Sequence, residues 1–216
     1  MPTGPAAEAD EALGVVHETH LGRPRWWLRP PTPEQTSAVA RLGLVEQRRI
    51  DRLERPLPFD TAARGLTTRP FDPERDVEEW LEVNNAAFAW HPDQGGWDAA
   101  RLVAALAEPW VDLDGFLVHE ADSGRLDGFC WTKVHPGTPL IGEIYVIAVD
   151  PAAHGRGLGR SLVIAGLHYL STVSGAEMGM LYVESDNVAA QHLYADLGFE
   201  LAWTDVAVGL PGESPP

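Results

Sequence analysis

The stretch DPAAHGRGLGRSLV, residues 150–163, places three glycines within five positions, at Gly155, Gly157 and Gly159. Glycine weakens both helices and strands, so this density indicates a backbone shaped around a ligand. An apolar run ends at Asp150, and an amphipathic run begins near Gly159. A strand, a glycine loop and a helix in that order direct several backbone N–H groups to one point, where the helix dipole adds partial positive charge. The stretch therefore predicts an anion site, although an ordinary tight strand-to-helix turn has the same outline.

The loop differs from the two best-known phosphate loops. It does not match the dinucleotide-binding pattern G-x-G-x-x-G, and it lacks the G-K-[ST] of a P-loop. Two arginines within it, Arg156 and Arg160, can reach flanking phosphates. We therefore interpret the anion as a pyrophosphate.

Composition limits the classes of partner. The chain has 216 residues, 44% of them hydrophobic, with 32 acidic against 16 basic residues and a formal net charge of −16. That charge would repel nucleic acid, so we expect no nucleic-acid partner, and an amine substrate is favoured. No apolar run is long enough to span a membrane, no signal-peptide pattern opens the chain, and Cys130 is the single cysteine. We expect a cytoplasmic protein without a membrane partner, in which Cys130 is a small apolar strand residue rather than a nucleophile.

Composition also divides the chain into five segments. Residues 1–16 are expected to be disordered, and residues 209–216 read as a frayed tail. Residues 17–57 predict a strand, a helix and a strand, and residues 58–65 predict a linker. Residues 66–208 predict one α/β domain in the order strand, helix, helix, two strands joined by a turn, strand, glycine loop, helix, strand, helix, strand.

A faint internal repeat joins the two halves of this plan. ARLGLVEQRRIDRLE, residues 40–54, aligns without gaps with ADLGFELAWTDVAVG, residues 195–209, and shares A-x-L-G-[LF]. The shared pattern is short enough to arise by chance. If it is real, residues 17–57 are the last strand, helix and strand of a first domain that is otherwise missing.

The glycine stretch also resembles a known signature. VDPAAHGRGLGRSLV is similar to the acyl-CoA motif [RQ]-x-x-G-x-[GA] of the GCN5-related N-acetyltransferases (GNAT), with His154 in place of the usual Gln or Arg. YVESDNVAAQHLYADLGFE resembles the second signature of that family, in which an Asn is followed seven residues later by a Tyr and then by L-G-F. The resemblance implies the GNAT fold, an α/β structure with a mixed central sheet flanked by helices, and acetyl-CoA as cosubstrate.

Residues 66–208 are further similar to the C-terminal domain of the mycothiol synthases, a family with two tandem acetyltransferase domains. The most diagnostic segments are 91–94 (HPDQ) and 131–133 (WTK), and residues 17–57 resemble the end of the family's N-terminal domain. This resemblance implies acetylation of the cysteinyl amine of cysteinyl-glucosaminyl-inositol in mycothiol biosynthesis. The alternatives are another amine acceptor, such as a peptide N-terminus or an aminoglycoside, and a non-catalytic acyl-CoA-binding remnant.

Two residues carry the catalytic hypothesis. Glu143 stands in the middle of an apolar strand, where alternation places Glu143, Tyr145 and Ile147 on one face. The pattern alone leaves a paired core carboxylate and a working carboxylate equally open, and it favours simple packing for Tyr194 near the end of the last helix. By resemblance, Glu143 is the general base or binds the amine, and Tyr194 is the general acid that protonates the departing thiolate.

The remaining site residues follow from the resemblance, which implies that one set contacts coenzyme A and another contacts the acceptor. The acceptor set is Asp93, Lys133, Glu143 and Tyr182, although Lys133 alone would read as a solvated strand-end cation. The coenzyme A set is Ile147, Ala148, Val149, His154, Gly155, Arg156, Gly157, Leu158, Gly159, Arg160, Asn187, Val188, Ala189, Ala190, Gln191 and His192.

Other side chains are assigned structural roles. His91, His135 and His192 are spaced too irregularly for a metal site, and we expect no metal. We expect four tryptophans to lie in the core or in a cleft wall rather than to form a platform for a sugar: Trp80, Trp90, Trp97 and Trp110. We expect a monomer that acts on a small-molecule amine.

Overall fold

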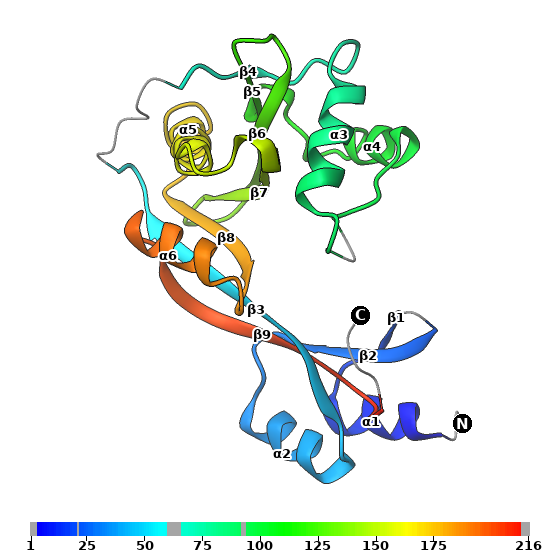
Figure 1. Cartoon of the computed structure of the whole chain (residues 1–216). Helices are drawn as coiled ribbons and strands as arrows, with labels where there is room; N and C mark the ends of the chain where they lie inside the picture. Colours follow the sequence, from blue (N-terminus) through cyan, green and yellow to red (C-terminus); the bar gives the residue numbers. More distant parts are fainter. Residues whose placement is uncertain (1–3, 21, 60–65, 92–93, 213–216) are drawn as a thin grey trace. The chain divides into compact units, whose positions relative to one another are not determined.

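The structure, a computed structural model, describes residues 4–20, 22–59, 66–91 and 94–212. The chain forms two compact units (Figure 1). The terminal unit comprises Met1–Glu54 with Tyr182–Pro216, and the central unit comprises Arg55–Leu181. Among the described residues, no helix is both long and apolar enough to cross a bilayer.

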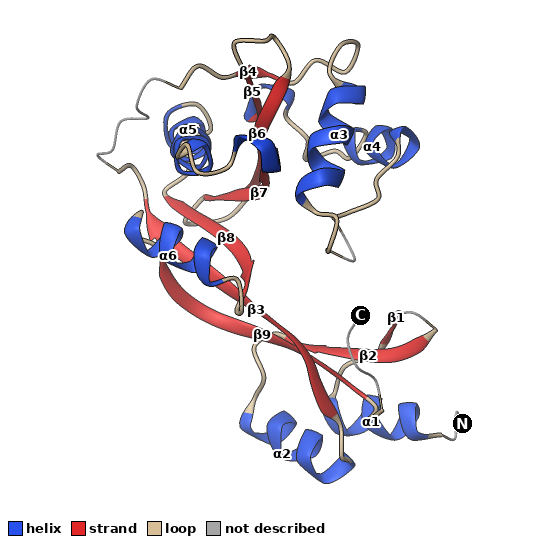
Figure 2. Ribbon diagram, viewed as in Figure 1, coloured by secondary structure: helices blue, strands red, loops and turns tan. Residues whose placement is uncertain are grey.

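The central unit is a mixed sheet between two helical layers. Its strands lie in the order β8-β7-β6-β5-β4, antiparallel except for the parallel pair β7 and β8. Helices α3 and α4 cover one face and α5 covers the other, as Figure 2 shows. The strands are β4 (Arg69–Pro70), β5 (Phe116–Glu120), β6 (Leu126–His135), β7 (Ile141–Val149) and β8 (Met178–Glu184), and the helices are α3 (Val77–Ala87), α4 (Ala99–Leu106) and α5 (Leu158–Thr172). Each of these elements was expected from the sequence.

Aromatic rings fill the space between the sheet and α3. Trp80 of α3 is 1% exposed and meets Phe129 and Trp131 of β6. The rings of Phe116 and Trp131, on neighbouring strands, stack with their centroids 4.3 Å apart. Such pairs add about 0.5–1.5 kcal/mol each to the burial of their surface. This core fixes the face of the sheet that carries Glu143.

A β-bulge in β7 corrects the alternation expected from the sequence. Trp131 pairs with Val146 and Thr132 pairs with Ile144, so Tyr145 is an extra residue without a partner on β6. One extra residue inverts the in-out pattern beyond it. Val146, rather than Ile147, therefore joins Tyr145 on the face that packs against the aromatic core. The expected face of Glu143, Tyr145 and Ile147 is wrong in its third member.

The terminal unit contains a second sheet segment and its helices. Its strands lie in the order β1-β2-β9-β3, all antiparallel. The strands are β1 (Glu18–His20), β2 (Arg23–Leu28), β3 (Val45–Pro56) and β9 (Glu200–Gly209), and the helices are α1 (Pro5–Leu13), α2 (Pro33–Leu42) and α6 (Val188–Asp196). A capping box at Thr32 starts α2, and Gly43 ends it in the left-handed conformation.

Helix α1 contradicts the disorder expected for residues 1–16. Ala9 and Leu13 are buried in the core of the terminal unit, and Asp10 accepts a hydrogen bond from the indole N–H of Trp26 at 2.7 Å. The segment is poor in large apolar residues, but two buried apolar side chains and the hydrogen bond from Trp26 hold it in place. Residues 60–65 of the expected linker and residues 213–216 of the expected tail lie outside the described residues.

The ladder between β3 and β9 is symmetric about its middle. Val45 pairs with Gly209 at one end, and Glu54 pairs with Glu200 at the other. The ladder contains two bulges, in which Gln47 of β3 and Ala202 of β9 are the extra residues. The repeat alignment of residues 40–54 with 195–209 also matches Gln47 with Ala202. Equivalent positions in the two strands therefore have equivalent roles in the ladder.

An ion pair joins the first strand of the central unit to its first helix. The Arg69 guanidinium donates two hydrogen bonds to Asp76, at 2.5 and 2.8 Å, and Asp72 N–H donates a third at 2.8 Å. Burial of Asp76 by itself raises the pKa of its carboxyl group. The hydrogen bonds from Arg69 and Asp72 outweigh burial and hold this pKa below its ordinary value.

This pair makes stability depend on pH. Because the pKa of Asp76 is lower in the folded chain than in the unfolded chain, its contribution is full above the ordinary Asp range and is lost as the pH falls. We predict that Asp76→Asn lowers the free energy of unfolding by about 2 kcal/mol at pH 7, and that the difference shrinks below about pH 4. Urea unfolding followed by tryptophan fluorescence measures it, with exposed Glu74→Gln as control. A difference that stays constant down to pH 3 would contradict the assignment.

Candidate active site

The glycine loop is open toward the outside of the central unit. Gly155 and Gly157 have φ angles of 79° and 76°, and a Cβ atom at either position would meet nothing within 4 Å. Helix α5 begins at Leu158, with no side chain capping its first turn and no acidic residue in it. The first N–H groups of a helix have no partner within the helix, so those of α5 are available to an anion beside the loop.

Two cations flank this loop. Arg156 is exposed and Arg160 is half-buried, and neither makes an ion pair or hydrogen bond with any residue that the structure describes. The His154 ring contacts the end of β7, where its Nε2 atom lies 3.1 Å from the carbonyl oxygen of Val149. Backbone N–H groups and two available guanidinium groups are donors suited to a pyrophosphate.

The edge of β7 offers further backbone groups beside the loop. Within the central unit, the parallel ladder of β7 with β8 runs from Ile141, paired with Met178, to Ile144, paired with Leu181. On the opposite edge, Asp150 N–H donates to Asp127 O. Because the hydrogen bonds of an antiparallel ladder alternate, the N–H and C=O groups of Ile147 and Val149 point away from β6. The Val149 carbonyl already lies 3.1 Å from His154 Nε2, so the groups of Ile147 and the N–H of Val149 are those that can pair with an extended ligand as a strand would.

Glu143 is a buried carboxylate on the face of β7 that packs against the aromatic core. It is 7% exposed, and its Oε2 atom lies 2.7 Å from Nε2 of His135, on β6. Lys133 stands directly opposite Glu143 in the ladder. Buried carboxylates are rarely found without a partner, and here the partner is an imidazole.

The ammonium of Lys133 lies against aromatic rings instead of pairing with Glu143. Its Nζ atom is 4.4 Å from the ring centre of Trp110 and 5.2 Å from that of Tyr145. Burial, and next the charge of Glu143, raise the pKa of the Tyr145 phenol, so this group stays neutral. The groups around the Glu143 carboxylate are thus one imidazole, one ammonium and the aromatic rings of Trp110 and Tyr145.

The segment between α3 and α4 is tied down by two asparagines. Asn84 donates to the carbonyl of Gln94 at 2.8 Å. Asn85 donates to the carbonyl of Trp97 and accepts from its N–H, both at 2.8 Å. Asp93, expected to contact the acceptor, lies outside the described residues.

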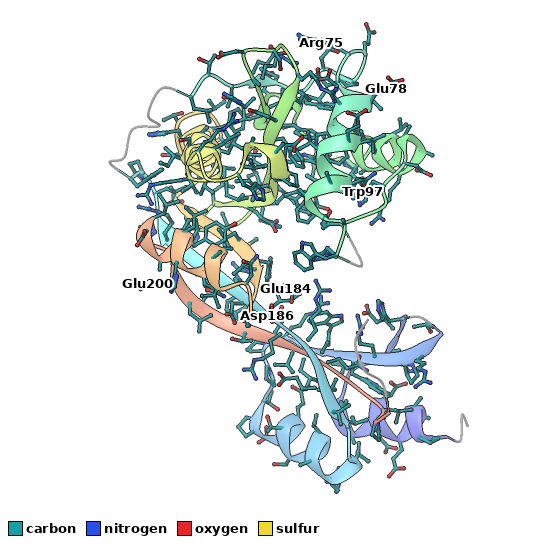
Figure 3. All side chains as sticks on the ribbon, viewed as in Figure 1. Arg75, Glu78, Trp97, Glu184, Asp186 and Glu200 are labelled. Carbon is teal, nitrogen blue, oxygen red and sulfur yellow. The ribbon has the colours of Figure 1, made fainter. Side chains whose placement is uncertain are left out.

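The four tryptophans divide between two environments. Trp80 and Trp97 are buried, and Trp110 packs against Tyr145 and Trp131, as expected. Figure 3 labels Trp97, which is packed edge-on against Trp80. Trp90 is 64% exposed and therefore lies outside the core.

Four further predicted site residues lie in the terminal unit. Tyr182 is 43% exposed, and Arg52 lies 6.0 Å from its ring centre. Asn187 caps α6 by accepting from Ala190 N–H at 3.2 Å. Gln191 donates to Asp51 at 2.8 Å. Tyr194 is 7% exposed, and its ring packs edge-on against Phe199.

The single thiol, Cys130, is buried. Burial raises the pKa of Cys130 to about 12, so the thiol is not a nucleophile at neutral pH. The described residues contain no group of three His, Cys, Asp or Glu side chains that could hold a metal ion.

The model of the acetyltransferase (GNAT) family matches residues 75–199, which include the glycine loop, Glu143 and Tyr194. The chain belongs to the acetyltransferase (GNAT) family. The fold expected from the two signatures is thereby confirmed, and the family uses acetyl-CoA.

Individual relatives narrow the likeness within the GNAT family. The chain is 46% identical over 189 residues to the mycothiol acetyltransferase of Mycobacteroides abscessus, covering 86% of this chain and 64% of the relative. The chain thus spans a little under two thirds of the length of the curated relatives it matches.

Solved structures agree on the fold. A GCN5-related N-acetyltransferase from Sphaerobacter thermophilus has a TM-score of 0.70 at 22% identity, over 88% of this chain and 61% of that one. A tandem GNAT protein from the clavulanic acid biosynthesis pathway has a TM-score of 0.58 at 18% identity, over 89% of this chain and 61% of that one.

Three residues around the candidate site were not predicted from the sequence to make the contacts seen here. His135 was considered only as a metal ligand, yet it bonds to Glu143. The available signal was the hairpin itself, because pairing Lys133 with Glu143 places His135 diagonally beside the carboxylate. Asn84 and Asn85 gave a weaker signal, as adjacent amides near the end of an amphipathic helix.

Asn85 gives a test of how the α3–α4 segment is held. Asn85→Ala removes both hydrogen bonds to the backbone of Trp97, a residue that is 8% exposed. We predict a loss of about 1–3 kcal/mol in the free energy of unfolding and a red shift of tryptophan emission in the folded protein. Glu78→Ala, exposed on the same helix and labelled in Figure 3, is the control and should change neither. Equal stabilities of the two variants would remove Asn85 from this role.

Proposed function

We propose that the chain is an acetyl-CoA-dependent N-acetyltransferase that acetylates the cysteinyl amine of cysteinyl-glucosaminyl-inositol, the step that forms mycothiol. The observation that carries the chemistry is Glu143, a carboxylate 7% exposed in mid-strand, beside aromatic rings and one ammonium. The name of the relatives, mycothiol acetyltransferase, supports the choice of acceptor. The single cysteine fits a reducing compartment, and we propose a cytoplasmic monomer.

The residues beside the glycine loop fit coenzyme A. Acetyl-CoA supplies an activated thioester, and its pyrophosphate needs donors of the kind that the open loop and the first turn of α5 present. In the proposal, residues 154–160 hold the pyrophosphate, and the β7 edge at residues 147–149 pairs with the pantetheine arm. Residues 187–192 border the same ligand. Asn187 and Gln191 already make contacts that shape α6.

Glu143 is proposed to take a proton from the acceptor amine. An α-amine with an ordinary pKa near 7.7–8.0 is mostly protonated at neutral pH, so a carboxylate that accepts this proton generates the nucleophile. Lys133, Tyr182 and Asp93 are proposed to contact the sugar and inositol hydroxyls. Tyr194 is proposed to donate a proton to the departing thiolate.

Residues 17–57 are proposed to be the end of a first GNAT repeat. The β3–β9 ladder supports this, because the bulges at Gln47 and Ala202 fall at positions that the repeat alignment equates. Two unrelated strands would have no reason to place their bulges symmetrically. The likeness to a tandem GNAT protein points the same way.

The first experiment is release of CoA from acetyl-CoA, with cysteinyl-glucosaminyl-inositol as acceptor. Glucosaminyl-inositol without the cysteine is the matched control, because it lacks only the proposed nucleophile. Release with the first acceptor alone supports the proposed function. Release with a peptide N-terminus or an aminoglycoside instead would identify another amine acceptor, and acetyl-CoA binding without any release would identify a non-catalytic binding protein.

The glycine loop yields a matched pair of variants. Gly157 and Gly124 both have positive φ, and neither has an atom within 4 Å of an added Cβ. An alanine at either site is strained by about 1 kcal/mol or more, but only Gly157 lies beside the proposed pyrophosphate. We predict that Gly157→Ala weakens acetyl-CoA binding at least tenfold in calorimetry, whereas Gly124→Ala leaves it unchanged. Equal affinities would place the pyrophosphate elsewhere.

Glu143 is tested by removing its charge while keeping its shape. We predict that Glu143→Gln lowers kcat by about 10²- to 10⁴-fold, because an amide does not accept the amine proton. Acetyl-CoA affinity should stay within about twofold, since the loop and the β7 edge are intact. Glu78→Gln, on the exposed side of α3, serves as the control. An unchanged kcat would remove Glu143 from the mechanism.

A further inference from the structure

His135 is bonded to the proposed general base from a neighbouring strand. It stands on β6 opposite Ile141, so Glu143, two residues further along β7, is its diagonal neighbour. Its Nε2 atom lies 2.7 Å from Oε2 of Glu143, and its side chain is 37% exposed. This is the one hydrogen bond that the Glu143 carboxylate makes with any residue the structure describes.

The two oxygens of Glu143 therefore have different surroundings. Oε2 is held by the imidazole. Oε1 accepts no hydrogen bond from any residue that the structure describes. A carboxylate fixed through one oxygen, with no such partner on the other, is arranged to receive a proton on that second oxygen.

A competing partner stands directly across the ladder. Lys133 pairs with Glu143 in register, and side chains at such positions have Cβ atoms about 4.5–5.5 Å apart. The Lys133 ammonium nevertheless lies over Trp110 and Tyr145. A salt bridge between Lys133 and Glu143 would occupy a carboxylate oxygen and make the carboxylate a poorer base, because an adjacent positive charge favours the ionised form.

We propose that His135 is the positioning residue of Glu143. Its Nε2–H group donates to Oε2, holds the carboxylate away from Lys133 and leaves Oε1 turned to the acceptor amine. This role rests on the proposed function. In the step it serves, one N–H bond of the acceptor ammonium breaks and an O–H bond forms at Oε1. The electron pair of the broken bond stays on nitrogen as the nucleophile, and the proton on Oε1 later returns to solvent.

Two substitutions separate positioning from packing. His135→Gln keeps an N–H donor near the position of Nε2, whereas His135→Leu keeps the bulk and removes the donor. We expect His135→Leu to lower kcat by about 10- to 100-fold with the KM for acetyl-CoA unchanged, a part of the 10²- to 10⁴-fold that general bases contribute. We expect His135→Gln to restore kcat to within about fivefold of the wild-type value.

A matched control comes from the other face of the sheet. His168 of α5 stacks on Phe59 with ring centres 5.1 Å apart and lies outside the proposed machinery. His168→Leu should leave kcat unchanged. Equal losses in His135→Leu and His135→Gln, or no loss in either, would overturn the proposal.

A second readout does not depend on catalysis. With isotope-labelled glutamate, the Glu143 carboxyl signal is assigned by its loss in Glu143→Gln and is compared by NMR at one fixed pH in wild type, His135→Leu and His135→Gln. We expect the signal to move in His135→Leu, where the hydrogen bond is lost, and to lie closer to its wild-type position in His135→Gln. An unchanged signal in His135→Leu would overturn the proposed contact.

If wild type acetylates no amine, the proposed function fails, while the NMR comparison still decides whether His135 holds Glu143.

Discussion

The extra residue in β7 is the constraint on which the arrangement of the candidate site depends. Tyr145 has no partner on β6, so the strand changes its facing pattern between Glu143 and Ile147. On one side of the bulge, Glu143 is directed toward the aromatic face. On the other, Ile147 presents its N–H and C=O groups at an edge that β8 does not cover within the central unit. One local irregularity thus places a buried carboxylate and a strand edge that is open within the central unit a few residues apart.

Electrostatics reinforces this division of roles. The whole chain is strongly acidic, with a net charge of −16, so an anionic ligand gains nothing from the overall field. Its binding must come from local groups, and the glycine loop supplies them through Arg156, Arg160 and the first turn of α5. Near Glu143 the arrangement is reversed, because the cation Lys133 lies on aromatic faces and leaves the carboxylate to an imidazole. An amine can therefore approach the carboxylate without displacing an existing salt bridge.

The sequence predicted features that depend on local chemistry. Glycine density located the loop, because glycine acts on the backbone of a few neighbouring residues. Features that depend on how two strands pair could not be predicted from the sequence. The bulge at Tyr145 depends on how β6 and β7 align, and the contact of His135 with Glu143 depends on the same register. Helix α1 was missed because its stability comes from tertiary burial of Ala9 and Leu13 rather than from its composition.

Within the terminal unit, residues 17–54 help to hold α6 in place. Strand β3 pairs with β9 along almost its whole length, and β9 follows α6, the helix that carries Tyr194 and caps itself with Asn187. Asp51 of β3 accepts hydrogen bonds from Gln191 of α6 and from Thr204 of β9. Removing β3 would expose one edge of β9 and withdraw the acceptor that holds α6 to it. The N-terminal segment therefore acts as part of the support for α6.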